Sequence, residues 1–317
     1  MALYLTESDI GGLLTMPDVL EVLEDMFRAR SRGEIVNRPR VRIPITAGSY
    51  NVMPASWVER GVVGHKMYTA SAKGATFQIV LYAGDGSGLM AVMGGGRISG
   101  LRTGAVTGLA ARLFAVRPGG PIAVIGTGFQ ATAQVNGLVA ATGATDIRVH
   151  GRSSDKREAF AARMAESTGV DVHAVDSVDA ALDGADVVVT ITNSADPVIR
   201  AEHLRPGLTV IAAGNNTWLR SEIDPHIAGR ADLVVVDDLD NAKIEAGELM
   251  RAAEAGLFSW DTAIGLHDVI GGVRPGRTSA DQIVLVELQG IGIEDVAVAE
   301  LAYRRARERG VGLELPA

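Results

Sequence analysis

The chain has 317 residues, a formal net charge of −8 at pH 7, and a composition that is 47% hydrophobic but only 4% aromatic. The acidic balance excludes a general nucleic-acid or anionic-membrane surface, because both need a basic footprint. The lack of cysteine excludes disulfides, thiolate metal sites and a cysteine nucleophile. We therefore expect a cytoplasmic protein of two domains that binds a small molecule, with no nucleic-acid partner, no membrane segment and no metal.

The first hundred residues predict a helix followed by antiparallel strands. The helix covers 16–30, where apolar residues recur on one face at Val19, Leu20, Leu23, Met26 and Phe27. Extended segments follow at 38–44, 50–54 and 62–69, and a hairpin is predicted from 76–82 and 89–93 around the turn at 85–88. This order indicates a small α+β domain.

Lys66 is the first candidate site residue, within the predicted strand 62–69. Alternation places it on the same strand face as Gly64 and Tyr68. An ammonium among largely apolar neighbours is usually paired with an anion or used in catalysis. The alternative is an edge-strand lysine whose head group extends to solvent.

Arg102 is predicted to open a helix that runs to about residue 115. At a helix start, its guanidinium and the free backbone donors of Thr103 and Gly104 can jointly bind a carboxylate. The alternative is a structural salt bridge. Arg40 is a further candidate cation, although two neighbouring arginines compete with it for the role.

The segment 121–131, PIAVIGTGFQA, reads as a strand, a tight turn and the start of a helix. In such a segment Gly126 permits the turn, Gly128 lets the backbone approach a pyrophosphate, and Ala131 allows close packing of the helix on the strand. The helix N-terminus supplies free N–H donors. The pattern predicts a dinucleotide site, although glycine-rich turns also occur without a nucleotide.

Beyond residue 121, strands and helices alternate at a spacing typical of a doubly wound parallel sheet. Strands are predicted at 121–125, 146–150, 171–175, 185–190, 207–213, 231–236 and 283–288, and helices at 130–142, 155–168, 177–183, 239–255 and 294–309. The predicted fold is α/β: a Rossmann-type dinucleotide-binding domain at 118–289, plus a smaller α+β substrate and dimerisation domain from 1–117 with 290–317. The closing helix is expected to pack back on the smaller domain.

The end of the second strand of the dinucleotide domain bears on the identity of the nucleotide. An NAD site offers a carboxylate to the ribose 2′-hydroxyl at this position. Here the chain offers Arg152, Ser153 and Ser154, followed by Lys156 and Arg157. Cations and hydroxyls suit a 2′-phosphate, so the sequence favours NADP(H) over NAD(H). The alternative is a solvated basic loop at a helix start.

The sequence resembles the ornithine cyclodeaminase/μ-crystallin family across nearly the whole chain. The family contains cyclodeaminases, alanine dehydrogenase, NADPH-dependent ketimine reductases, and μ-crystallin, which binds NADPH and thyroid hormone. The motifs that carry the resemblance are Asn51-Val-Met-Pro54, Gly64-His-Lys66, the segment 101–111, Ile125–Ala131, Gly151-Arg-Ser153, Ala185–Thr190, Glu245-Ala-Gly-Glu248 and Gly290–Asp295.

The resemblance implies a homodimer in which N-terminal sheets pair, with a Rossmann domain facing them across the active-site cleft. It also implies residue roles. The substrate residues would be Arg40, Asn51, Lys66 and Arg102. Lys66 would additionally assist proton transfer at the nitrogen on Cα, and Asn216 would stand at the second catalytic position. The cofactor residues would be Thr103, Gly126, Thr127, Gly128, Phe129, Gln130, Arg152, Ser153, Arg157, Thr192 and Asn193.

Two departures from the cyclodeaminase pattern bear on the reaction. The carboxylate that activates the nucleophile in cyclodeaminases is replaced here by Asn216, and an acidic residue before the Met-Pro motif is replaced by Asn51. An amide cannot act as a base. Leu288 stands where a serine is frequent in the family, which indicates a more apolar pocket.

The sequence therefore favours an NADPH-dependent reductase of an α-imino acid, such as pyrroline- or piperideine-2-carboxylate, that runs in reverse as an amino-acid dehydrogenase. Hydride transfer to a preformed imine needs only a carboxylate anchor, a proton donor and a placed nicotinamide. The first alternative is an ornithine cyclodeaminase that recycles bound NAD. The second is a μ-crystallin-like binding protein in which catalysis is incidental.

Overall fold

The computed structural model describes residues 1–316 and divides into two compact units. One unit contains Met1–Arg102 and Ile291–Ala317, and the other contains Thr103–Gly290. The first division therefore lies at 102, not at the predicted 117. The reason is packing within the second unit: a Cβ added to Gly104 would lie 1.9 Å from the carbonyl oxygen of Ala133, so only glycine permits this contact.

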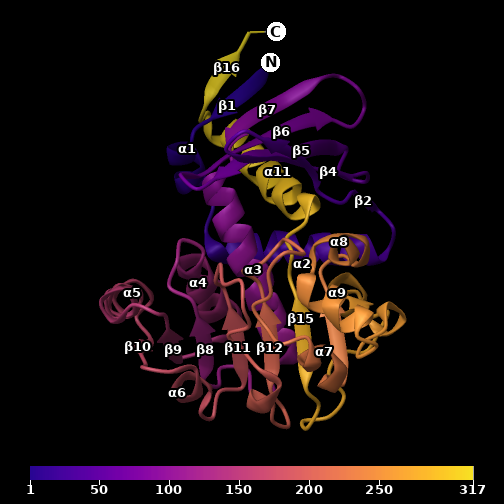
Figure 1. Ribbon diagram of the computed structural model, residues 1–317. Helices are drawn as coiled ribbons and strands as arrows, with labels where there is room; N and C mark the ends of the chain where they lie inside the picture. Colours follow the sequence, from indigo (N-terminus) through magenta and orange to yellow (C-terminus); the bar gives the residue numbers. More distant parts are fainter. Residues whose placement is uncertain (317) are drawn as a thin grey trace. The chain divides into compact units, whose positions relative to one another are not determined.

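The first unit is built on a mixed eight-stranded sheet. The strands run in the order β16-β1-β7-β6-β5-β4-β2 (Figure 1), and β3 also pairs with β4. The elements are β1 (Ala2–Leu5), α1 (Glu7–Leu13), α2 (Met16–Ser31), β2 (Ile35–Asn37), β3 (Val41–Ile45), β4 (Gly48–Trp57), β5 (Val62–Ser71), β6 (Gly74–Ala83), β7 (Leu89–Gly94), the start of α3 (Gly96–Phe114), α11 (Gly292–Arg309) and β16 (Leu313–Leu315). The predicted antiparallel strands are present.

The closing helix α11 packs on β4, β5 and α2 of the first unit, as expected from the sequence. Its first two turns are buried. Its later part is fixed by Arg305, whose guanidinium donates to both carboxylate oxygens of Asp18 at 2.6 and 2.7 Å. Asp18 also completes the N-terminal capping box of α2 with Thr15. The start of α11 is therefore held against the sheet face that carries Lys66.

The second unit is built on a parallel sheet in the order β10-β9-β8-β11-β12-β15-β13-β14, as Figure 1 shows for most of its strands. Every strand pair in it is parallel, which confirms the predicted doubly wound sheet. The strands are β8 (Ile122–Ile125), β9 (Asp146–His150), β10 (Asp171–Ala174), β11 (Val187–Thr190), β12 (Thr209–Ala212), β13 (Leu233–Val236), β14 (Ile264–Gly265) and β15 (Val284–Glu287). The order reverses beside β8, where such folds bind their ligands.

Helices connect the strands of this sheet. They are α4 (Ala131–Thr142), α5 (Ser154–Thr168), α6 (Val178–Leu182), α7 (His226–Arg230), α8 (Leu239–Glu245), α9 (Gly247–Glu254), α10 (Leu266–Ile270) and the 3-10 turns η1 (Ala201–His203) and η2 (Trp260–Thr262). The helix predicted at 239–255 is two helices. The backbone of Ala246 leaves the helical region, with ψ of 85°, and this ends α8.

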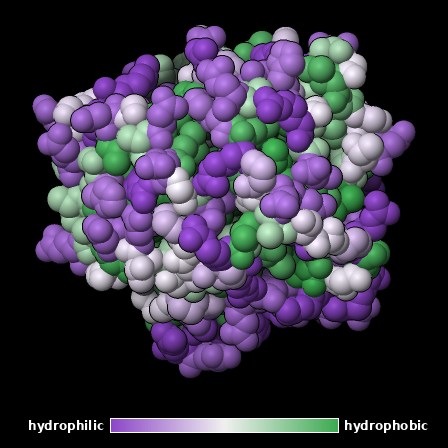
Figure 2. All heavy atoms as spheres, turned by 90° about the horizontal axis from the view of Figure 1, so that it is seen from below, coloured by the Kyte–Doolittle hydropathy of each residue, from purple (hydrophilic) through white to green (hydrophobic). Residues whose placement is uncertain are grey.

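Among residues 1–316, no helix is long and apolar enough to span a bilayer. Figure 2 shows one face, on which small hydrophobic areas are separated by hydrophilic side chains.

Candidate functional site

Lys66 lies in a buried ionic cluster of the first unit. Its ammonium is 2.8 Å from Oδ2 of Asp295 and 3.3 Å from Oγ of Ser99, and the residue is 1% exposed. β5 presents Lys66 on the buried face of the sheet, the face that it shares with Gly64, and the first turn of α11 presents Asp295. The alternative of an edge-strand lysine that reaches solvent is thereby excluded.

Arg102 joins the same cluster. Its Nη1 donates to Oε2 of Glu294 at 2.8 Å, and its Nε donates to Oδ1 of Asp295 at 3.3 Å. The prediction that Arg102 opens a helix is wrong, because α3 begins at Gly96. The carboxylate of Glu7 accepts the N–H groups of Gly96 and Arg97 at that start.

This correction changes what the helix can offer a ligand. Thr103 and Gly104 lie within α3, where backbone N–H groups bond to the preceding turn, so they are not free donors for a carboxylate. Thr103 also accepts a hydrogen bond from the hydroxyl of Thr107 at its carbonyl oxygen. The guanidinium of Arg102, by contrast, contacts the carboxylates of Glu294 and Asp295.

Arg40 and Asn51 lie on the same side of the first sheet. Arg40 is 8% exposed, and its guanidinium carbon lies 6.0 Å from the centre of the Tyr68 ring. Asn51 is 1% exposed, accepts a hydrogen bond from Nε of Arg42 at 3.0 Å and donates to Oγ of Ser49 at 2.9 Å. Of the three neighbouring arginines, Arg38, Arg40 and Arg42, Arg40 is the buried one.

The charges around Lys66 and its burial bring its pKa close to neutral pH. Burial and the nearby Arg102 lower the pKa of Lys66 to about 7, against the carboxylate of Asp295, which raises it. Burial also raises the pKa of Glu294, opposed by Arg102. Lys66 can therefore both hold and release a proton near pH 7.

Sequence reasoning did not assign roles to Glu294 and Asp295. Both are buried, and they supply the counter-charges of Arg102 and Lys66. The signal present in the sequence was two adjacent acids at the start of a predicted helix, which is the ordinary pattern of helix capping. Only the packing of α11 on the sheet brings them to the cations.

In the second unit, the glycine turn has the predicted form. Gly126 has φ of +123°, and an added Cβ would lie 2.3 Å from the carbonyl oxygen of Ile191, so a side chain is excluded on both grounds. A Cβ on Gly128 would meet nothing within 4 Å. Ala131, at the start of α4, is fully buried. The turn therefore leaves open space above the backbone beside the helix N-terminus.

The side chains of this turn differ in exposure. Thr127 packs its side chain on Gly151, at the end of β9. Phe129 is 78% exposed. Oε1 of Gln130 is buried and has no hydrogen-bond partner among the described residues. An orphaned acceptor beside open space fits a site that is completed by a bound ligand.

The basic segment after β9 splits into two parts. Arg152 and Ser153 are exposed, and Ser153 precedes α5 without capping it through its side chain. Arg157 is buried and forms an ion pair with Asp176 as well as a hydrogen bond to the carbonyl oxygen of Gly151. Arg152 and Ser153 are available to an anion, whereas Arg157 already has a carboxylate partner.

Two further loops follow the ends of β11 and β12. The N–H of Thr192 donates to Oε1 of Glu222 at 2.5 Å, and the N–H of Gly214 donates to Oε2 at 2.6 Å. The carbonyl oxygen of Asn193 accepts from Arg220 at 3.2 Å. Asn216 is exposed on the second loop. Sequence reasoning did not find Glu222, because nothing local marks this acid as buried.

Glu222 belongs to a group of buried carboxyls in the second unit, together with Asp237, Glu248 and Glu287. Burial raises the pKa of Glu222 to about 7, and that of Glu248 upward as well. Burial and the neighbouring Glu248 raise the pKa of Glu287 well above its ordinary value. Within residues 1–316, no group of His, Cys, Asp or Glu has the arrangement needed to hold a metal ion.

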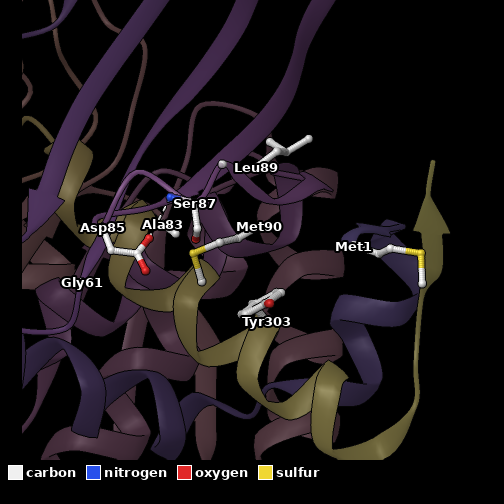
Figure 3. A pocket seen from close by; sticks show the side chains of 9 residues that line it. Met1, Gly61, Ala83, Asp85, Ser87, Leu89, Met90 and Tyr303 are labelled. Carbon is white, nitrogen blue, oxygen red and sulfur yellow. Dashed lines mark hydrogen bonds between the residues drawn. The ribbon is translucent and has the colours of Figure 1, made fainter. Parts of the chain in front are cut away.

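A separate surface hollow of about 520 Å³ lies in the first unit, where the β6–β7 turn meets α11 (Figure 3). Among its lining residues are Met1, Asp85, Ser87, Met90 and Tyr303. The carboxylate of Asp85 accepts the N–H of Ser87 at 2.8 Å, which closes the turn. Its lining includes none of the cations of the Lys66 cluster, so the hollow is distinct from that cluster.

Comparisons with solved structures give the same overall fold. The iminosuccinate reductase of Paracoccus denitrificans, in complex with NAD⁺, superimposes with a TM-score of 0.93 at 26% identity and covers 100% of this chain and 99% of its own. An archaeal alanine dehydrogenase dimer with bound NAD has a TM-score of 0.91 at 27% identity and covers 99% of each chain.

Sequence comparison points the same way. A Δ1-pyrroline-2-carboxylate reductase of Bacillus cereus is 31% identical over 224 residues, which is 70% of this chain and 69% of that protein. The model of the ornithine cyclodeaminase/mu-crystallin family matches residues 2–310. The resemblance predicted from the motifs is therefore confirmed, and the chain belongs to the ornithine cyclodeaminase/mu-crystallin family.

Proposed function

We propose that this protein is a nicotinamide-dependent reductase of an α-imino acid, which in reverse is an amino-acid dehydrogenase. The observation that carries the proposal is the buried Lys66, whose pKa is lowered to about 7 and whose partner carboxylate, Asp295, also contacts Arg102. The relatives support it, since they include a pyrroline-2-carboxylate reductase, an iminosuccinate reductase and an alanine dehydrogenase.

In this proposal the first unit binds and protonates the substrate. The guanidinium groups of Arg40 and Arg102 hold the α-carboxylate, since a planar fork matches a carboxylate. The Lys66 ammonium donates a proton to the imine nitrogen, directly or through one water, so that the adjacent carbon becomes electrophilic. Lys66 then regains its proton from solvent. Asp295 holds the ammonium at its position.

A nicotinamide cofactor, when bound, supplies the hydride in the reductive direction and accepts it in the oxidative one. The residues of the second unit fit such a group: the open space over Gly128 and the N-terminus of α4 suit a pyrophosphate. Thr192 and Asn193 are proposed to contact the ribose and nicotinamide.

We propose NADP(H) as the preferred cofactor, with NAD(H) weaker. Arg152 and Ser153 are exposed after β9, where an NAD site would present a carboxylate. A guanidinium and a hydroxyl suit a 2′-phosphate. Arg157 supports this proposed phosphate site indirectly, because its ion pair with Asp176 fixes the start of α5. The two structural relatives contain NAD, so the preference needs its own test.

Cyclodeamination and simple ligand binding are the competing functions. Asn216 can donate or accept a hydrogen bond but cannot take a proton, and the oxygen of Asn51 is engaged by Arg42. These features favour reduction over a reaction that needs additional bases. The buried Lys66 beside Asp295 supplies a proton donor, which simple ligand binding does not require.

One assay separates the three functions. Purified protein is incubated with NADPH and a panel of cyclic and linear imino acids, and separately with L-ornithine and catalytic NAD⁺. A reductase consumes NADPH without releasing ammonia. A cyclodeaminase releases proline and ammonia from L-ornithine without a net change in NAD⁺. A binder retains NADPH without turnover. In Lys66→Met, reduction should fall at least about a hundredfold while NADPH binding persists.

We also propose that the protein is a homodimer. The face of the first sheet opposite α11 carries exposed apolar side chains at Val41, Val63 and Tyr82. Pairing of this face with a second copy would cover them. The alanine dehydrogenase relative is described as a dimer. Light scattering should give twice the chain mass, and Val63→Glu with Tyr82→Glu should reduce it to the monomer value.

A further inference from the structure

Two strand-end loops of the second unit touch each other at Thr192 and Gly214. A Cβ added to Gly214 would lie 2.4 Å from the backbone nitrogen of Thr192 and 2.6 Å from Oε2 of Glu222. The loops follow β11 and β12, which are neighbours in the sheet. Gly214 is therefore in close contact with the backbone of Thr192 and with the carboxylate of Glu222.

Glu222 is itself held firmly. Its carbonyl oxygen accepts the N–H of Val198 at 2.7 Å, and its N–H donates to Oε1 of Glu248 at 2.6 Å. The next residue, Ile223, forms a β-bridge with Ile199. The side chain of Glu222 is fully buried, so its orientation is set by these anchors and not by solvent.

The carboxylate of Glu222 suits its position because it has two acceptor oxygens. Oε1 accepts the N–H of Thr192, and Oε2 accepts the N–H of Gly214, at 2.5 and 2.6 Å. In its ionised form, which predominates above pH 7, the carboxylate makes these bonds charge-assisted and therefore stronger than neutral ones. A glutamine could accept only one of the two, and its NH₂ group would face the other N–H.

We propose that Glu222 is a positioning residue for the nicotinamide half of the cofactor, because it joins the loop of Thr192 and Asn193 to the loop of Gly214 and Asn216. This inference rests on the proposed function, which assigns the first of these loops to the ribose and nicotinamide. The adenine half is assigned to other segments, namely 126–130 and Arg152 with Ser153. Glu222 should therefore affect the binding of the nicotinamide half of the cofactor and not that of the adenine half.

The test compares two ligands on the full-length chain by calorimetry. Adenosine 2′,5′-bisphosphate reports the adenine half, and NADPH reports both halves. In Glu222→Gln, the Kd for NADPH should rise about tenfold, the effect of one lost charge-assisted hydrogen bond, while the Kd for the bisphosphate stays the same. The KM for the imino acid should not change, because its anchors lie in the other unit.

The matched control is Glu245→Gln, a buried acid of α8 that accepts from Asn241 and contacts neither Thr192 nor Gly214 by a hydrogen bond. It should leave both Kd values unchanged. Equal weakening of both ligands in Glu222→Gln would mean general damage to the unit and would overturn the inference. Unchanged NADPH binding would overturn it too. If the unaltered protein bound no nicotinamide nucleotide, the proposed function itself would fail.

Discussion

The ammonium of Lys66 lies 2.8 Å from Oδ2 of Asp295, and both side chains are almost fully buried. A buried pair of this kind is held together because removal of either charge leaves the other without compensation. Burial and the positive charge of Arg102 lower the pKa of Lys66, whereas the negative charge of Asp295 raises it. The balance of these effects sets the pH range in which Lys66 can donate.

The first prediction concerns the pH dependence of reduction. The protonated form of Lys66 is the donor, so kcat/KM for imine reduction should fall as pH rises through about 7. The oxidative direction uses neutral Lys66 and should rise over the same range. In Asp295→Asn the negative charge beside the ammonium is lost, so the pKa of Lys66 falls. The pH at which kcat/KM declines should therefore move about one to three pH units lower.

Glu294→Gln serves as the comparison for this experiment. Glu294 pairs with Arg102 and not with Lys66. Its removal should therefore shift the pH at which kcat/KM declines by less. The rates are measured by stopped-flow or steady-state kinetics at pH 5 to 9. If the pH dependence of kcat/KM were the same in Asp295→Asn as in the unaltered protein, Asp295 would not set the pKa of Lys66.

The second prediction concerns substrate affinity. Arg102→Lys keeps the positive charge but loses the planar fork that contacts Glu294 and Asp295. We expect the KM for the imino acid to rise about tenfold, corresponding to about 1.4 kcal/mol, and the thermal midpoint to fall. Arg112→Lys, exposed near the end of the same helix, should change neither. A KM equal to that of the unaltered protein would show that Arg102 is purely structural.

Much of the fold could be predicted from the sequence, because it depends on local patterns. The buried run at Val187–Thr190 reads directly as a strand of a parallel sheet, and alternation in β5 placed Lys66 on the same strand face as Gly64, which is the buried face. The glycine turn at 126 was predictable because its chemistry lies in consecutive residues.

The site could be predicted only in part, because its partners are far apart in the chain. Arg102 and Asp295 are 193 residues apart, and only tertiary packing pairs them. The start of α3 was misplaced because its cap is the carboxylate of Glu7, almost ninety residues earlier. Glu222 was missed for the same reason, since the two N–H groups that it accepts belong to loops at 192 and 214.

The third prediction concerns stability and pH. The pKa of Glu287 is raised on folding, so the folded state binds a proton that the unfolded state releases above about 4.5. The stability that this proton contributes is present in full below pH 4.5 and is lost as pH rises toward the folded pKa. Within that window the loss is about 1.4 kcal/mol for each pH unit.

Glu287→Gln removes this titration and keeps the volume. The free energy of unfolding in urea, measured from pH 5 to 8, should therefore fall less steeply in the variant than in the unaltered protein. Glu166→Gln, an exposed acid of α5, controls for the loss of one carboxyl. Parallel slopes for Glu287→Gln and the unaltered protein would contradict the prediction.

The last prediction concerns the choice between NADPH and NADH. In Arg152→Asp, a carboxylate faces the 2′-phosphate, so NADPH binding should weaken about a hundredfold, through a lost charge-assisted hydrogen bond and added repulsion. NADH has no 2′-phosphate, and a carboxylate can accept from its 2′-hydroxyl, so NADH binding should hold or improve. Fluorescence titration measures both. Arg163→Asp makes the same charge change later in α5 and should leave the NADPH to NADH ratio as it was. Equal losses for the two nucleotides in Arg152→Asp would remove the basis for an NADP site after β9.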